Sequence, residues 1–154
     1  MRHFIPTLLV AAVVLPAAAQ ERVPPVADPL TAKECGACHM AFPPQFLPQR
    51  SWTAIMSGLD KHFGEDASLP DDQRDAILSY LLAHAGDTKG AGAAGSFARS
   101  VPKDAVPLRI IETPGWIKEH AEVSKARWAD PKVKSKANCA VCHTKAAEGV
   151  YEED

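Results

Sequence analysis

Apolar residues recur at helical spacing in two central segments of the chain. The first segment lies between Ser51, a favourable N-cap residue, and Gly64, a favourable C-cap residue. The second segment opens with Pro70, Asp71 and Asp72, which favour the start of a helix. The two apolar stripes consist of Trp52, Ile55, Met56, Leu59 and Phe63, and of Ile77, Leu78, Leu81, Leu82 and Ala85. Each segment is therefore predicted to form an amphipathic helix.

Capping signals predict a shorter helix before these two. Thr31 and Glu34 can satisfy each other's free backbone amides as a capping box, so a helix should run through residues 35–40. It should stop before Pro43 and Pro44, because proline cannot continue a helix.

Two more helices are predicted near the end of the chain. Thr113 and Pro114 have the N-cap and N1 arrangement and open a helix that carries Trp116 and His120. Ser135 can cap a last helix through residues 138–143. No segment has a convincing strand pattern, so the predicted fold class is all-α.

Between the helical regions lies a segment with little to bury. Residues 86–100 read GDTKGAGAAGSFARS, with four glycines, which is typical of a linker or mobile loop. We therefore expect an N-terminal lobe over 20–87, a flexible linker over 88–101 and a C-terminal lobe over 102–154, with long irregular connections. Each lobe is too small to depend on its apolar core alone, so each needs an additional stabilising group.

The first residues have the pattern of an export signal. Arg2 and His3 precede a short apolar run that ends in three alanines, residues 17–19. The run is shorter than the ~20 residues that span a bilayer. We predict a signal peptide over 1–19 and a periplasmic mature protein.

Charge is distributed unevenly along the chain. Removing residues 1–19 removes Arg2 and no acid, so 16 basic and 19 acidic residues leave a net charge of −3. A balance this modest argues against nucleic acid as a partner. Residues 28–87 carry four basic and nine acidic side chains, whereas residues 116–145 carry seven basic and three acidic ones.

The four cysteines occur as two CxxCH motifs, Cys35 and Cys38 before His39, and Cys139 and Cys142 before His143. This layout suits two covalently bound haem c groups, because two thioethers hold the macrocycle while the histidine binds its iron. Paired zinc-binding motifs normally lie only ~15–20 residues apart, and zinc gives no reason for the two histidines. A redox dithiol would need βαβ surroundings. Disulfides within such short pairs would close very small loops.

The second axial ligand of each iron must come from elsewhere in the chain. Met40 follows His39 directly and would project ~100° away around a helix, and Met56 belongs to an apolar stripe. No His and no Met follows His143, so the second haem needs an upstream ligand, and His120 is the best placed. For the first haem His62 and His84 compete, and helical periodicity does not decide between them.

The segments ECGACHMAFPPQFLPQRSW, DKHFGEDASL, RIIETPGWIKEH and NCAVCHTKAAEGVYEE resemble the family of small periplasmic dihaem cytochromes c. The resemblance covers most of the mature chain and weakens through residues 86–107. It implies two low-spin haems with two histidine ligands each, and an N-terminal lobe similar to class I cytochrome c. The matching distal positions are His62 and His120, while His84 has no counterpart.

The resemblance also implies redox partners, namely a membrane-bound b-type cytochrome and a small monohaem, oxygen-binding cytochrome. We therefore expect a monomeric electron carrier, with no nucleic-acid partner and no small-molecule substrate. The basic region around Lys132, Lys134 and Lys136 would dock an acidic partner. Two alternatives are the small dihaem subunit of a periplasmic nitrate reductase and a haem enzyme or sensor with a labile distal histidine.

Overall fold

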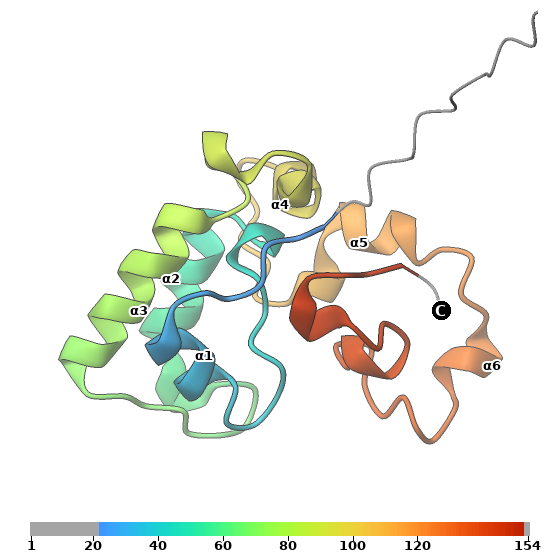
Figure 1. Ribbon diagram of the computed structural model, residues 1–154, viewed down its shortest axis with the longest axis horizontal. Coiled ribbons are helices and arrows are strands. Elements are labelled where there is room, and N and C mark those ends of the chain that lie inside the picture. Colours follow the sequence, from blue (N-terminus) through green and yellow to red (C-terminus); the bar gives the residue numbers. More distant parts are fainter. Residues whose placement is uncertain (1–21, 153–154) are drawn as a thin grey trace, which may run out of the picture.

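The computed structural model describes residues 22–152, so the predicted signal peptide lies outside the described residues. Within that range the chain contains helices and irregular connections and no β-strand, which confirms the all-α prediction (Figure 1). None of these helices is both long and apolar enough to cross a membrane. The α-helices are α1 Pro29–Cys35, α2 Gln49–Ser57, α3 Asp71–His84, α4 Ser96–Ser100, α5 Pro114–Glu119 and α6 Lys125–Trp128. The 3₁₀ helices are η1 Pro44–Phe46, η2 Leu59–Lys61, η3 Lys89–Ala91, η4 Ala93–Gly95, η5 Ile110–Glu112, η6 Cys139–Val141 and η7 Ala146–Glu148.

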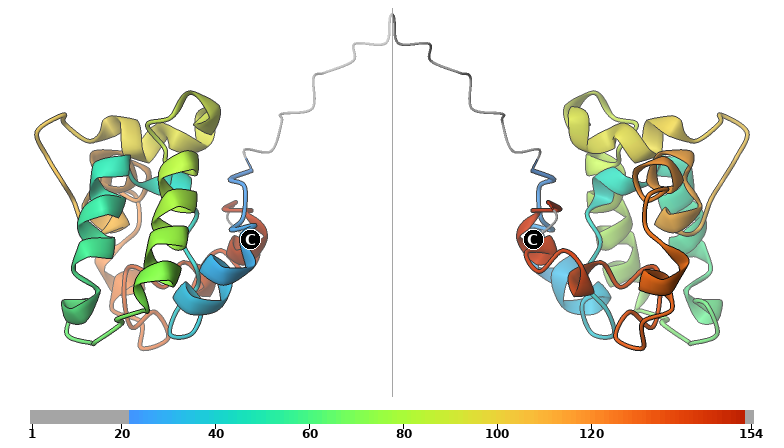
Figure 2. Two further views of the ribbon diagram at one scale, coloured as in Figure 1. Left: turned by 90° about the vertical axis from the view of Figure 1, so that its left-hand side faces the viewer. Right: turned by 90° about the vertical axis from the view of Figure 1, so that its right-hand side faces the viewer.

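The main core lies between α2 and α3, which pack side by side in both views of Figure 2. Ile77 and Leu81 of α3 are almost fully buried, as are Trp52 and Met56 of α2. The indole nitrogen of Trp52 donates a hydrogen bond to the Pro44 carbonyl oxygen at 2.8 Å, so this core also holds the segment before α2. The predicted stripes of the two helices therefore meet each other.

The helix before the first CxxCH motif differs from the prediction at both ends. Asp28 is the N-cap, and its carboxylate accepts hydrogen bonds from the Thr31 amide and hydroxyl, so Thr31 is not the cap. The helix ends at Cys35, and the rest of the motif forms turns.

The second predicted helix is shorter than its apolar stripe suggested. It begins after Pro48 and ends at Ser57, with Gly58 as its C-cap. Gly64 is not a helix cap but part of a separate turn, in which Phe63 and Gly64 have positive φ angles of 53° and 104°.

The segment predicted as a flexible linker is helical instead. Residues 88–101 contain η3, η4 and α4, and α4 packs on η1 and α5. Ala98 is buried, and a Cβ atom at Gly86 would collide with it and with the Gln45 carbonyl oxygen. Gly86 and Gly95 therefore allow close packing, whereas a Cβ atom at Gly90 or Gly92 would meet no atom within 4 Å. The glycine content alone had suggested flexibility throughout the segment. The boundaries of the two lobes stay a prediction.

The C-terminal region confirms one predicted helix and corrects another. Thr113 caps α5 by accepting a hydrogen bond from the Trp116 amide, as expected. The helix predicted after Ser135 is wrong: Lys134 has a positive φ of 57°, and only the short η6 follows. The sequence analysis also did not predict α6, which Ser124 caps.

A single hydrophobic core joins the N-terminal and C-terminal halves. Val23, Phe46, Ile110 and Trp116 are buried in the same cluster as the α2 and α3 residues. In Figure 1 the N-terminal segment runs between the α1–α3 group and the C-terminal segment. The amide of Val23 donates a hydrogen bond to the Gly149 carbonyl oxygen at 3.0 Å. Segments near both ends of the described chain therefore pack against each other.

Candidate haem-binding sites

The first CxxCH motif presents its histidine to the histidine that follows α2. The ring centroids of His39 and His62 lie 6.2 Å apart, and their planes are inclined by 26°. Nδ1 of His39 lies 2.8 Å from the Met40 carbonyl oxygen. Phe42 lies against His39, and Phe63 lies against His62, at ring distances of 5.0 and 4.7 Å.

A tight turn after α2 positions His62. The chain leaves α2 through η2, and His62 ends that 3₁₀ helix. The Glu65 amide then donates to the His62 carbonyl oxygen at 3.1 Å, across the turn formed by Phe63 and Gly64. Burial, with a smaller contribution from His39, lowers the pKa of His62. The neutral imidazole, which is the form that binds a metal, is therefore favoured.

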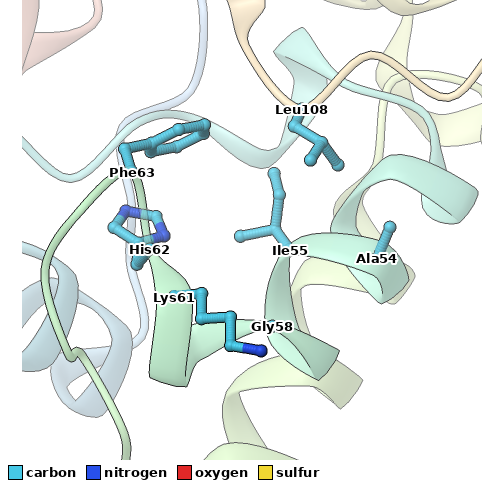
Figure 3. A pocket seen from close by; sticks show the side chains of 7 residues that line it. All are labelled: Ala54, Ile55, Gly58, Lys61, His62, Phe63 and Leu108. Atoms are coloured by element: carbon cyan, nitrogen blue, oxygen red, sulfur yellow. The ribbon is translucent and has the colours of Figure 1, made fainter.

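An apolar hollow opens beside this imidazole. Figure 3 shows His62 and Phe63 on one side of it and Ile55 and Leu108 on the other. The Arg109 guanidinium lies over the Phe63 ring, 4.1 Å from its centroid. Phe63 and Leu108 are nevertheless 48% and 42% exposed, so these apolar surfaces are available to a large apolar ligand.

The second CxxCH motif is paired with the histidine that ends α5. The ring centroids of His120 and His143 also lie 6.2 Å apart, but their planes are nearly perpendicular, at 88°. His120 is the C-cap of α5, and its Nδ1 lies 2.9 Å from the Trp116 carbonyl oxygen. The Trp116 ring stacks on His120 at 4.1 Å with a 15° inclination. Tyr151 contacts His143 edge-on at 5.7 Å.

The ring separation in both pairs fits a shared metal ion. Metal–imidazole bonds of ~2 Å on either side, together with the distance from each nitrogen to its ring centre, place two centroids about 6 Å apart. In His39 and His120, Nδ1 faces a backbone carbonyl oxygen, which leaves Nε2 as the nitrogen for the metal. The structure therefore brings together the predicted pairs His39 with His62 and His143 with His120. The ligand assignments themselves stay a prediction.

The other candidate ligands lie elsewhere. His84 is exposed at the end of α3, where its Nδ1 is 2.8 Å from the Tyr80 carbonyl oxygen and its ring contacts the Tyr80 ring. Met56 is 4% exposed within the main core. The structure thus brings His62, and not His84, to the first motif, which periodicity had left open.

The cysteines have the surroundings of attachment points and not of a reactive dithiol. Burial raises the pKa of the Cys35 and Cys139 thiols, whereas a reactive dithiol needs a lowered pKa. None of the four cysteines, which also include Cys38 and Cys142, is in a disulfide. Within residues 22–152, no group of three or more His, Cys, Asp or Glu side chains could hold a bare metal ion.

The sequence reading missed the aromatic residues that pack on the ligands. Trp116 and His120 are four residues apart, a spacing that places side chains on one helix face, so this contact could have been found. The contact between Tyr151 and His143 depends on how the C-terminal segment returns to the site. No local pattern shows that return.

Comparisons with known proteins identify the family of the chain. The family model for dihaem cytochrome c matches residues 31–151. A dihaem cytochrome c from Rhodobacter sphaeroides is 50% identical, with a TM-score of 0.75, and the match covers 82% of this chain and 98% of that one. A crystal structure of DHC purified from Rhodobacter sphaeroides is 47% identical, with a TM-score of 0.69, over 82% of this chain and 99% of that one.

A more distant solved structure agrees as well. A dihaem c-type cytochrome from Shewanella baltica OS155 is 32% identical, with a TM-score of 0.66, over 80% of this chain and 86% of that one. No curated protein matches the chain. The sequence resemblance, the paired motifs and these comparisons lead to one conclusion: the chain belongs to the dihaem cytochrome c family and carries two covalently bound haem c groups.

Proposed function

We propose that this protein is a periplasmic electron carrier that passes single electrons between a membrane-bound b-type cytochrome and a soluble redox partner such as a small monohaem cytochrome. The two imidazole pairs, each with centroids 6.2 Å apart, carry the proposal. A haem iron supplies one-electron redox chemistry when it is bound. Two histidines per iron leave no open coordination position for a substrate, so the protein's role is transfer and not catalysis.

In this proposal the protein does three things at each site. Cys35 and Cys38, and likewise Cys139 and Cys142, fix the haem to the chain. One histidine of the motif and one distal histidine, His62 or His120, would bind the iron. Backbone carbonyl oxygens orient His39 and His120 through Nδ1, which fixes the rings and reduces reorganisation during transfer.

Low-temperature EPR of the oxidised holoprotein tests the ligand set. We expect two low-spin ferric signals in the wild type. The His62→Ala and His120→Ala variants should each convert one of them, and only one, to a high-spin signal. The matched control is His84→Ala, which should leave both signals unchanged because His84 lies at the exposed end of α3.

Two outcomes would contradict the proposal. One is a loss of low-spin signal in the His84 variant. The other is rapid binding of carbon monoxide by the reduced wild type, which would reveal an open coordination position. The first result would assign His84 as an iron ligand in place of His62, and the second would favour a haem enzyme or sensor with a labile ligand.

A basic surface near the second site supports an acidic partner. Lys132, Lys134 and Lys136 are exposed, and the Lys136 ammonium lies 5.3 Å from the Trp128 ring centroid. Arg127 and Lys132 also line a hollow that reaches Cys142. A partner that docks here would approach the attachment point of the second haem, and opposite charge would accelerate its encounter.

Reaction kinetics test this docking surface. Charge reversal of Lys132, Lys134 and Lys136 to Glu should lower the second-order rate with an acidic redox partner by about tenfold or more at low salt, and high salt should reduce the difference. Reversal of three exposed basic residues outside this surface, Lys33, Lys89 and Lys103, is the matched control. Rates that are indifferent to salt and to the triple change would exclude docking at this surface.

A further inference from the structure

We propose that Trp116 and Tyr151 are positioning residues that hold the imidazole planes of His120 and His143 perpendicular, so that the second haem differs electronically from the first. The inference rests on the proposed histidine ligation of both irons. The angle between the ring planes is 88° in the second pair and 26° in the first, although the centroid separation is the same.

Trp116 determines the orientation of the His120 ring. The indole lies 4.1 Å from the imidazole and within 15° of its plane, so rotation of the imidazole would collide with the indole. Trp116 is itself 6% exposed and packs in the main hydrophobic core. Because the Trp116 carbonyl oxygen also faces Nδ1 at 2.9 Å, one residue contacts both the face and the edge of the ring.

Different elements orient the His143 ring. Tyr151 contacts it at 5.7 Å with a 61° inclination, and Nδ1 of His143 is 3.4 Å from the Glu152 carbonyl oxygen. Tyr151 is held in turn by Phe46, with ring centroids 5.3 Å apart in an edge-on arrangement. Phe46 belongs to the main core, so packing against the N-terminal half, and not against α5, orients His143.

Different aromatic contacts orient the rings of the first pair. His39 packs on Phe42 with a 26° inclination, and His62 packs on Phe63 at 60°. Both aromatic residues are near neighbours in sequence of the histidine that they contact. The resulting rings are close to parallel.

The angle between the planes affects the iron directly. Each imidazole donates π density into the iron d orbital that is perpendicular to its plane. Parallel rings act on the same orbital and separate the two d orbitals in energy, whereas perpendicular rings act on both and leave them nearly equal. Axial ligands and their hydrogen-bonding neighbours are thus the means by which a protein tunes a haem.

EPR of the oxidised holoprotein tests the inference. We expect one ordinary rhombic low-spin signal and one highly anisotropic low-spin signal with a large maximum g value. Trp116→Leu should shift the second signal to lower maximum g and leave the first unchanged, while Trp116→Phe, which keeps an aromatic face, should largely retain it. Trp128→Leu is the matched control, because Trp128 is 6.2 Å from His120 and inclined by 37°.

A second pair of variants keeps the test decisive if Trp116→Leu fails to fold. Tyr151→Leu should shift the same signal, and Tyr151→Phe should preserve it. Two rhombic signals in the wild type, or an unchanged anisotropic signal in both Leu variants, would overturn the inference. Near-infrared magnetic circular dichroism reports bis-histidine ligation independently of the ring angle, so a failure of the ligand assignment is distinguishable from a failure of this inference.

Discussion

The site around His39 and His62 lies after α1 and α2, which both pack on α3, whereas the site around His120 and His143 is built on short helices and turns. Helix α3 has 14 residues, but α5 has six and α6 has four. Residues 22–101 supply most of the buried apolar side chains, and residues 121–152 supply only Val133 and Ala146. The same motif and the same ring separation therefore occur on two scaffolds that bury very different numbers of apolar side chains.

The comparison implies that the second half depends more on its haem than the first half does. A large apolar macrocycle can replace the core that a small lobe lacks. Each prediction below tests this difference, or sharpens it, by changing one scaffold and leaving the other intact.

Removal of one haem attachment should have the largest effect. In Cys139→Ala/Cys142→Ala, amides in residues 121–152 should lose protection against hydrogen exchange, with local opening free energies falling towards ~0 kcal/mol. In Cys35→Ala/Cys38→Ala, the amides of α2 and α3 should stay protected, because these helices bury their own core. Intact mass would verify that each variant has lost one haem. Equal loss of protection in both halves would remove the proposed difference.

Substitution at the contact between the two ends should have the next largest effect. Gly149 has a φ of 80°, and an added Cβ atom would collide with the Val23 carbonyl oxygen. Gly149→Ala should therefore lower the free energy of unfolding by about 3 kcal/mol through strain and steric overlap. Chemical denaturation would measure the change. A loss below about 1 kcal/mol would contradict this, because it would show that the Val23 segment can shift to make room for the added Cβ atom.

The turn that carries His62 should respond more weakly. Gly64 has a φ of 104°, but a Cβ atom there would meet no other atom within 4 Å, so the cost of Gly64→Ala is backbone strain of about 2 kcal/mol. The first EPR signal should change and the second should not. Gly90→Ala is the matched control, since Gly90 has no positive φ and an equally open environment. Similar losses in both variants would contradict the strain argument.

Loss of the α5 cap should have the smallest effect. Thr113 is fully buried, and its hydroxyl accepts from the Trp116 amide and donates to the Ile110 carbonyl oxygen. Thr113→Ala should cost about 1–1.5 kcal/mol, whereas Thr113→Ser, which keeps the hydroxyl, should cost less. Thermal unfolding of the two variants would measure the difference. Equal losses of stability in the two variants would show that the effect comes from the Thr113 methyl group, which both variants remove.

Local signals in the sequence predicted those elements that are fixed locally. Asp71 and the stripe that includes Ile77 and Leu81 define α3, and Thr113 with Pro114 defines the start of α5. At the start of α1, where two residues could serve as the N-cap, the sequence alone did not decide between them. Asp28 is the cap of α1 and Thr31 is bonded to it, because a carboxylate that precedes Pro29 can accept from both the amide and the hydroxyl of Thr31.

Tertiary packing decided the remaining elements. Helix α4 forms where Ala98 meets Gly86, and no pattern in a glycine-rich segment indicates that contact. For the sites, the motifs identified one histidine each, and the histidine-free end of the chain directed the search to His120. The contact of Trp116 with His120 follows from a spacing of four residues, but the angles between the rings and the contact of Tyr151 with His143 depend on how distant segments pack, and these were not predictable.

The hydrogen bond between Val23 and Gly149 also has a consequence for the order in which the protein matures. A chain made from its N-terminus cannot bury Val23 until almost all of the later residues are present. Contacts between residues so far apart in sequence form late and slowly, because closing a long loop costs entropy. Both cysteine pairs precede Gly149 in the chain and therefore emerge before this contact can close.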